Sequence, residues 1–193
     1  MSNNFSVFGV LTLKNETVYG VWNTSAGGNS IDVSIGDYNV NEGKHISSEG
    51  PSNVFDQNAN SKFLVSGDCM CGNNTALCGV KTGIYLTLVR GATLLTGVQF
   101  CTGNDGAERD PMTITIEGSN DISSSALTLG SSWTLIYSGT TGLITDPGRR
   151  ANGTIQYFSN SSWYKSYRIL VTTKRGINCI VQYSEIYLLG ISL

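Results

Sequence analysis

The stretch from Thr113 to Asp121 reads Thr-Ile-Thr-Ile-Glu-Gly-Ser-Asn-Asp. Polar and apolar side chains alternate over residues 113–117, which is the two-residue period of a β-strand with one face in a core. Gly118 then frees the backbone angle φ, and the Ser, Asn and Asp side chains that follow bond their own backbone in turns. The stretch therefore predicts a strand that ends in a tight turn.

The same pattern recurs along the whole chain. Short runs rich in apolar residues are bounded by Gly, Asn, Asp and Ser, and no window of about a dozen residues shows a helical stripe. The predicted strands span residues 5–13, 17–22, 31–35, 84–89, 96–102, 113–117, 133–137, 154–158, 167–172 and 181–189. Many short strands separated by turns predict an all-β fold, a jelly-roll β-sandwich.

Polar residues at 39–43 separate the first three predicted strands from the rest. We therefore expect an added N-terminal β segment, residues 1–42, and a main sandwich domain, residues 43–193. The strands of the added segment carry apolar side chains on both sides, with Val7 beside Phe8 and Tyr19 near Trp22. Because such strands are usually buried on both faces, the segment either covers a sheet of its own domain or packs on a neighbouring copy by strand addition.

The composition favours an extracellular β protein. Of the 193 residues, 40% are hydrophobic and only 13% are charged, with 12 basic and 14 acidic side chains and a net charge of −2. The low charge leaves Ser, Thr, Asn and Gly to form the surface. Without a block of Lys and Arg, no nucleic-acid partner is expected, and no apolar run has the length for membrane insertion.

Asn-x-Ser/Thr sites and cysteines bear on the compartment. The start, Met-Ser-Asn-Asn-Phe-Ser, has no signal-peptide pattern, so a secreted protein would have lost its leader or would begin upstream. The candidate N-glycosylation sites are Asn4, Asn15, Asn23, Asn73, Asn152 and Asn160. Together with five cysteines, these sites favour an extracellular, secreted or surface-attached glycoprotein.

The cysteines predict two disulfides and one leftover thiol. Cys71–Cys78 is the simplest pair in the Gly- and Asn-rich loop, with Cys69–Cys78 as the alternative, and Cys101 and Cys179 at two strand ends form the second predicted pair. A zinc site made by the three loop cysteines and His45 is a weaker alternative, because Cys-x-Cys is not the common zinc-knuckle spacing.

From Ser47 onward the chain resembles the discoidin-like, galactose-binding-like β-sandwich, the group that includes coagulation-factor type C domains and family 32 carbohydrate-binding modules. Residues 52–64 are similar to that group's early loop, A-x-D-G-N-x-x-T-K-W-L, and residues 102–111 resemble its central loop. Glu-Gly-Ser-Asn-Asp at 117–121, followed by Trp133, resembles E-G-S-N-D … W, and residues 164–169 resemble Y-K-x-Y-R-L. Residues 182–188 match the closing strand. The resemblance implies the same sandwich fold.

The resemblance also implies a structural calcium ion in the early loop. Calcium takes six to eight oxygen ligands. The residues expected to supply them are Asp56, Ser61, Glu185 and the carbonyls of Asn53 and Asn58. The chain departs from the family at Gln57, Ser61 and Phe63, where the motif has Gly, Thr and Trp. Gln57 matters most, because the turn favours φ > 0 at this position unless Asn58 adopts it.

Relatives of this group bind glycans through loops at one end of the sandwich. The candidates for that role here are His45, Trp163, Arg149 and Arg150, whereas Trp133, Tyr164 and Tyr167 are expected in the core. We expect no catalysis, because His45 is the single histidine and no nucleophile motif is present. A carboxylate pair among Glu108, Asp110 and Glu117 is the remaining catalytic alternative.

These observations predict a non-catalytic carbohydrate-binding or adhesion module whose partners are glycans or glycoproteins. The alternative is a structural subunit of an extracellular filament or matrix, whose partners are other copies of the chain. The alternative rests on the apolar N-terminal strands and on the apolar C-terminal residues 188–193. The pairing partner of residues 1–22 distinguishes the two.

Overall fold

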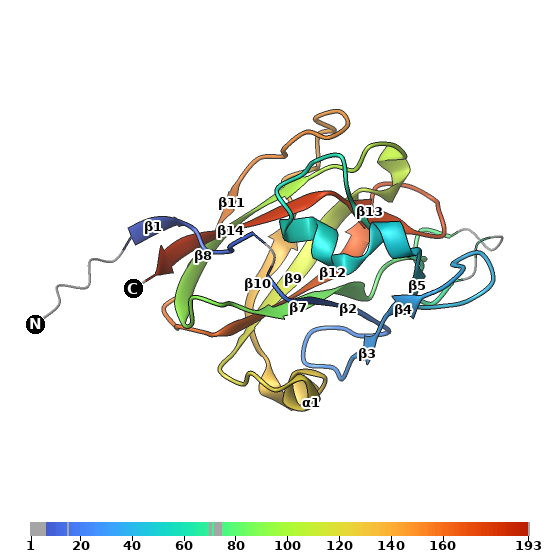
Figure 1. Cartoon of the computed structure of the whole chain (residues 1–193). Coiled ribbons are helices and arrows are strands. Elements are labelled where there is room, and N and C mark those ends of the chain that lie inside the picture. The colour runs from blue at the N-terminus through green and yellow to red at the C-terminus, as the bar shows by residue number, and fades with distance from the viewer. Residues whose placement is uncertain (1–6, 15, 70, 72–74, 193) are drawn as a thin grey trace, which may run out of the picture.

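The computed structural model describes residues 7–14, 16–69, 71 and 75–192, and its regular structure is mostly β-strand (Figure 1). Within these residues, two large antiparallel sheets pack face to face. The smaller has the order β1-β14-β8-β11, with strands Val7–Val10, Glu185–Ser192, Thr93–Cys101 and Gln156–Tyr157. The larger has the order β10-β9-β12-β7-β2-β3, with strands Thr134–Thr140, Pro111–Ser119, Ser166–Lys174, Thr82–Thr87, Val18–Trp22 and Ile31–Asp32.

Short elements close the ends of the sandwich. Two small sheets pair β13 (Val181–Tyr183) with β6 (Phe63–Val65) and, in parallel, β4 (Ser34–Ile35) with β5 (Lys44–His45). One α-helix and four 3-10 helices complete the described structure: η1 (Ser47–Glu49), η2 (Pro51–Phe55), η3 (Ala107–Arg109), α1 (Ser124–Leu127) and η4 (Gly130–Ser132).

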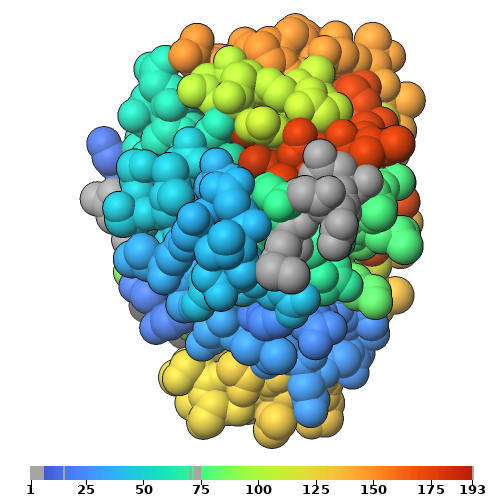
Figure 2. Space-filling model, turned by 90° about the vertical axis from the view of Figure 1, so that its right-hand side faces the viewer, coloured from blue at the N-terminus to red at the C-terminus, as the bar shows by residue number. Residues whose placement is uncertain are grey.

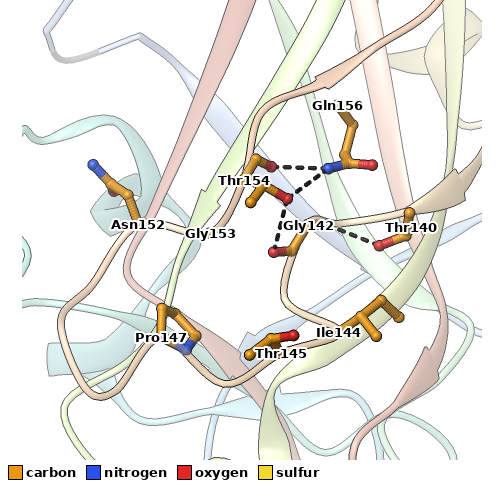
Figure 3. A pocket seen from close by; sticks show the side chains of 9 residues that line it. All are labelled: Thr140, Gly142, Ile144, Thr145, Pro147, Asn152, Gly153, Thr154 and Gln156. Atoms are coloured by element: carbon orange, nitrogen blue, oxygen red, sulfur yellow. Dashed lines mark hydrogen bonds between the residues drawn. The ribbon is translucent and has the colours of Figure 1, made fainter.

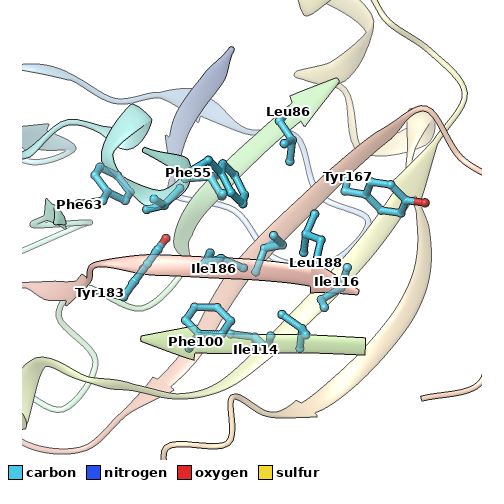
Figure 4. Close-up of a cluster of buried hydrophobic side chains, with 14 of the residues drawn as sticks. Phe55, Phe63, Leu86, Phe100, Ile114, Ile116, Tyr167, Tyr183, Ile186 and Leu188 are labelled. Carbon is cyan, nitrogen blue, oxygen red and sulfur yellow. The ribbon is translucent and has the colours of Figure 1, made fainter. Parts of the chain in front are cut away.

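The main core lies between the two sheets (Figure 4). Phe100 and Leu188 point inward from the smaller sheet and meet Ile114 and Ile116 of the larger one, and all four are fully buried. Each such side chain contributes about 1.5–3 kcal/mol to folding. A second cluster, with Trp133 at its centre, lies on the outer face of the larger sheet, so the middle strands β7 and β12 are buried on both faces.

The N-terminal segment pairs with sheets of its own chain. β1 runs antiparallel to β14 from Val7↔Ser192 to Val10↔Leu189, and β2 lies between β7 and β3. Figure 2 shows this segment, in blue, packed against the residues around α1, in yellow, and around residues 45–60, in cyan. The described strands of residues 1–42 therefore cover sheets of their own domain, and packing on a neighbouring copy stays a prediction.

The predicted strand runs all overlap observed strands, and the all-β sandwich is confirmed. Sequence reasoning missed β6, because all three of its residues are buried and no alternation marks it. It also missed β5, which has two residues. The structure divides two runs that were expected to be continuous, at Val33 and at Ser184.

The disulfide pairing corrects the prediction. Cys69 bonds Cys78 and Cys71 bonds Cys179, with Cα atoms 5.2 and 4.9 Å apart. The predicted Cys71–Cys78 and Cys101–Cys179 pairs are wrong, and the alternative Cys69–Cys78 is right. Cys179 immediately precedes Ile180 and β13, and these residues pack beside Cys71, whereas Cys101 is a buried free thiol at the end of β8. The zinc alternative fails as well, since its three cysteines are in disulfides.

In the described part of the chain, no helix has both the length and the apolar character needed to cross a membrane.

Candidate functional site

The early loop and the start of β14 meet at one corner of the sandwich. The Asn58 N–H donates to Asp56 Oδ1 at 2.8 Å and to Glu185 Oε1 at 2.7 Å. Ser61 Oγ lies 2.6 Å from the other Asp56 oxygen and 2.8 Å from the Asn58 carbonyl oxygen. Four of the five predicted calcium ligands therefore converge. Asn53 lies beside them, and its side-chain amide donates to the carbonyls of Ser48 and Lys62.

The charge balance of this corner fits a cation. Glu185 is 2% exposed, and neither Asp56 nor Glu185 forms an ion pair with any described residue. Burial raises the pKa of Glu185 to about 7, and the adjacent Asp56 carboxylate adds to the rise. No group of three or more His, Cys, Asp or Glu side chains lies together in the described residues, so carbonyl and hydroxyl oxygens would have to complete a calcium shell.

Gln57 itself adopts the left-handed conformation that the family motif assigns to glycine. Its φ is 62°, so the positive φ falls on Gln57 and not on Asn58, which was the predicted alternative. A side chain in this region costs about 1–2 kcal/mol. The turn thus keeps the shape that the motif requires in spite of the substitution.

Charged and amide side chains bond each other at one end of the sandwich. We call this region the braced end, and it comprises Lys62, Asp105, Asp110, Arg149, Arg175 and Gln182. Arg149 donates to both oxygens of the fully buried Asp110, at 2.8 and 2.7 Å, and Arg175 approaches the same carboxylate at 3.4 Å. The buried Lys62 ammonium lies 2.8 Å from Asp105 Oδ1 and 3.0 Å from Gln182 Oε1. The side chains of the braced end therefore satisfy one another's charges and hydrogen bonds.

The four predicted glycan contacts do not form one site. His45 is buried with its ring edge against Phe63, so the ring is not accessible to a ligand. Arg149 belongs to the braced end, and Arg150 is exposed beside it. Trp163 is half-buried and lies near the start of β8, because its neighbour Tyr164 bridges to Thr93. Arg150 lies near the other end of β8, because the nearby Asn152 bridges to Cys101. A strand of this length separates the two groups by roughly 27 Å.

The carboxylates of the catalytic alternative are also separated. Asp110 is held by Arg149, and Glu117 is buried in an ion pair with Arg168 at 2.7 Å. Glu108 accepts from Asn178 at 3.1 Å. Because two of the three carboxylates are buried with positive partners, this set does not provide the facing acid pair of a glycosidase.

Two hollows open on the side of the sandwich between β10 and the segment that includes β11. Hollow A has a volume of about 350 Å³ and is lined by uncharged residues of the 140–156 segment (Figure 3). Its polar groups bond each other: Gln156 donates to Thr154, and Gly142 N–H donates to Thr140 Oγ1. No aromatic ring lines it.

Hollow B is larger, about 500 Å³, and combines two aromatic rings with small polar side chains. The rings are those of Phe158 and Tyr164. The rest of the lining consists of aliphatic, hydroxyl and amide groups: Thr96, Thr134, Leu135, Ile136, Ser159, Asn160, Ser161 and Ser162. No charged side chain lines it. Phe158 also stacks on Tyr137, with ring centroids 4.6 Å apart.

The walls of hollow B are held in place by the backbone. Tyr164 exchanges two backbone hydrogen bonds with Thr93, at 2.8 and 3.0 Å. Its ring lies against Gly118, where a Cβ would come within 2.3 Å of the ring. Gly118 lies within β9 and its φ is not positive, so this glycine is required for space rather than for the turn that the sequence predicts. Asn160 fixes the loop opposite, since its amide nitrogen donates to the carbonyls of Leu95 and Ser162 at 3.0 Å.

Sequence reasoning placed Tyr164 in the core with Trp133 and Tyr167. The latter two are buried, and Tyr164 is partly buried, packed against the main core, and also lines hollow B. The signal for this site was the run of Asn and Ser at 159–162, which is flanked by Phe158 and by Trp163 and Tyr164. A polar loop between aromatic residues is the composition of a small-ligand pocket.

The glycosylation candidates differ in their surroundings. Asn23 and Asn152 are exposed, whereas the amide of Asn160 is held by the two bonds described above. Asn4, Asn15 and Asn73 lie outside the described residues.

No family model matches the sequence, and no curated protein matches it. Solved structures do. The family 32 carbohydrate-binding module of NanJ from Clostridium perfringens, in complex with galactose, superposes with a TM-score of 0.51 at 12% identity over 74% of this chain and 86% of its own. The family 62 module of Xyl5A from Clostridium thermocellum gives 0.51 at 17% identity over 93% and 96%. A family 89 glycoside hydrolase from Clostridium perfringens gives 0.53 at 17% identity over 94% of this chain and 15% of its own.

Proposed function

We propose that this chain, which has the galactose-binding-like β-sandwich of those modules, is a non-catalytic carbohydrate-binding module whose sugar site is hollow B. The observation that carries the proposal is the lining of hollow B, two aromatic rings among hydroxyl and amide groups without a charge. A pyranose ring has an apolar C–H face and a rim of hydroxyls. It therefore matches a pocket that offers an aromatic surface and neutral hydrogen-bonding groups.

The rigidity of hollow B supports the same role. Tyr164 is fixed by its bonds to Thr93 and by its packing on Gly118, and the Asn160 loop is tied to Leu95. A preformed site loses little conformational entropy on binding, so modest contacts suffice. Galactose is the first sugar to test, because the module of NanJ was solved in complex with it.

The experiment is a glycan array followed by titration calorimetry with each sugar that binds. Tyr164→Ala removes one ring and should abolish measurable binding, and Ser161→Trp, which fills the hollow from an exposed position, should do the same. Tyr157→Ala is the matched control, an exposed tyrosine of β11 that lines neither hollow. Unchanged affinity in both hollow B variants would overturn the site, and no binding to any sugar would overturn the function.

We also propose that Asp56, Asn58, Ser61 and Glu185 hold a structural calcium ion. Support comes from the convergence of the two carboxylates on one N–H and from the absence of a positive side chain paired with either among the described residues. Bound there, the ion would link the early loop to β14 and neutralise both charges. None of these four residues lines hollow B.

An extracellular location, and with it a role in adhesion, is part of the proposal. Two disulfides and the exposed Asn23 and Asn152 sites support an oxidising, secretory environment. Secretion from eukaryotic cells followed by mass spectrometry of intact and deglycosylated protein tests it. Absence of disulfides in the secreted protein would contradict it.

Filament assembly remains a second candidate, favoured by the edge strand β1. Val7 and Phe8 on this strand are 61% and 56% exposed although β1 is paired on one side with β14. An exposed apolar edge is a template for another strand. Sedimentation velocity at high concentration tests this. Concentration-dependent polymers that Phe8→Lys abolishes would support it, and a monomer would exclude it.

A further inference from the structure

A row of four side chains crosses the outer face of the larger sheet, one from each of four neighbouring strands. In register, Glu117 of β9 faces Arg168 of β12, Arg168 faces Tyr85 of β7, and Tyr85 faces Tyr19 of β2. Glu117, Arg168 and Tyr85 are buried, and Tyr19 at the end of the row is 41% exposed. The row thus runs from a buried ion pair to a tyrosine in contact with solvent.

The rings of the two tyrosines stack on each other. Their ring centroids are 4.9 Å apart and the ring planes are inclined by 12°. Both tyrosines line a third hollow, hollow C, with a volume of about 430 Å³. Thr17 and Thr87 extend the sheet wall, and Ser124 and Leu127 of α1 form part of the opposite wall.

Hollow C is electrically neutral but has an unsatisfied polar group in its wall. The Arg168 charge is balanced by Glu117 at 2.7 Å, and no charged residue lines the hollow. Tyr85 lines it and is fully buried, yet its hydroxyl has no hydrogen-bond partner among the described residues. A buried polar group without a partner costs about 1–3 kcal/mol, so it marks a position where a partner is expected.

The Tyr85 hydroxyl remains a donor at neutral pH. Burial, together with the negative charge of Asp32, raises the pKa of Tyr85 to about 12. A hydroxyl donor in a hollow without charged lining is complemented better by an uncharged ligand with oxygen acceptors than by a cation.

We propose that hollow C is a second sugar-binding site, in which a neutral pyranose stacks on Tyr19 and supplies an oxygen acceptor to the Tyr85 hydroxyl. This inference rests on the proposed function for its ligand class, but its residues and its face of the molecule are different from those of hollow B. β2 lies four strands from β10 in the larger sheet, a separation of roughly 19 Å.

Two separated sites have a consequence for binding to branched or polymeric glycans. A chain that reaches from one site to the other binds the second as an intramolecular step, which raises overall avidity without any new contact. The module then discriminates by glycan length and spacing as well as by sugar type.

The test is fluorine NMR of protein labelled with 3-fluorotyrosine, titrated with galactose, N-acetylgalactosamine, glucose and mannose. The signals of Tyr19 and Tyr164 are assigned by single Tyr→Phe substitutions and report the two hollows separately. At least one sugar is expected to shift the Tyr19 signal in a saturable way, both in the wild type and in Tyr164→Ala.

Ser124→Trp fills hollow C from an exposed position and keeps Tyr19 in place. It should weaken the response at Tyr19 at least about tenfold and leave the response at Tyr164 unchanged. Tyr157→Ala is the control and should change neither.

A Tyr164 response without a Tyr19 response for all four sugars would overturn the second site and leave the proposed function standing. A Tyr19 response that persists in Ser124→Trp would also overturn it. If neither tyrosine responds to any sugar, both proposals fail.

Discussion

The braced end and the open side of the same sandwich use side chains in opposite ways. At the braced end, Asp110 is fully buried and shared by Arg149 and Arg175, and Lys62 is buried between Asp105 and Gln182. On the open side, hollows A and B have no charged lining residue at all. Charged side chains therefore bond each other at the end, whereas neutral polar and aromatic groups line the hollows on the side, where we propose that the sugar binds.

This difference is the reason why we place the proposed sugar site away from the charged loop residues. An arginine that donates to both oxygens of a buried carboxylate is stabilised where it is, and moving it toward a ligand would break those bonds. A neutral hydroxyl or amide at a surface exchanges water for a sugar hydroxyl at small cost. Mutations at the braced end should therefore affect stability, and mutations in hollow B should affect binding.

The largest stability effect is expected from the disulfide next to the braced end. Cys71–Cys179 spans a sequence separation of 108 residues and Cys69–Cys78 spans 9. Loop-closure entropy predicts a loss of about 4.7 kcal/mol for Cys71→Ala with Cys179→Ala, and about 3 kcal/mol or less for Cys69→Ala with Cys78→Ala. Urea unfolding measures both. A larger loss from the short loop would contradict the assigned pairing.

Asp110→Asn should be nearly as damaging. It leaves two partly buried guanidinium groups without their shared carboxylate, and the expected cost is about 3 kcal/mol. Asp146→Asn is the matched control, because Asp146 also contacts Arg149 but is 40% exposed, and its loss should cost less than about 1 kcal/mol. Equal losses for the two variants in chemical denaturation would show that the end is not braced by Asp110.

Calcium should stabilise the corner at Glu185 by a smaller, pH-dependent amount. The folded-state pKa of Glu185 is raised from 4.5 to about 7. Without calcium, this group favours the folded state fully below about pH 4.5, and that stability is lost as the pH rises through about 7. Calcium needs the ionised carboxylate, so its stabilisation should grow over the same range, to about 2.7 kcal/mol at a hundredfold excess over Kd.

Urea unfolding at pH 5 and pH 8, with calcium or with a chelator, measures this effect. Glu185→Gln should remove the pH dependence and the calcium response together. Magnesium serves as the cation control. An equal response to calcium at both pH values would contradict the role of Glu185.

The smallest effect is expected from Asn160 on the open side. Asn160→Ala removes the three side-chain hydrogen bonds that fix the loop of hollow B, at about 0.5 kcal/mol each, and should also weaken sugar binding. Asn152→Ala, at the exposed site in hollow A, is the control and should change neither property. Thermal unfolding and calorimetric titration of both variants provide the measurement.

The sequence predicted the strands and the fold because burial on one face leaves an alternating pattern. The strand at Phe63–Val65 was missed because it has only three residues, which are too few to show a period. Disulfide partners were mistaken because spacing in the chain does not report which segments meet, and Cys179 reaches Cys71 only through the packing of Ile180 and β13. These errors concern long-range contacts rather than local pattern.

The convergence of side chains at the Glu185 corner was anticipated from the sequence, whereas hollow B was not. Asp56, Ser61 and Glu185 are brought together as expected, since they belong to motifs that the chain shares with a known loop. The residues of hollow B lie outside those motifs except for Tyr164. The Tyr164 ring takes its position because Gly118 of β9 has no side chain there, which makes room for the ring. Single-residue reasoning does not capture that pairing.

The central claim is that recognition belongs to the uncharged open side and not to the braced end. The crystal structure of the protein soaked with galactose, or with the sugar that gives the strongest array signal, tests it most directly. We predict a pyranose seated in hollow B against Tyr164 and Phe158. A sugar bound instead at the braced end, beside Lys62 and Arg149, would contradict the account.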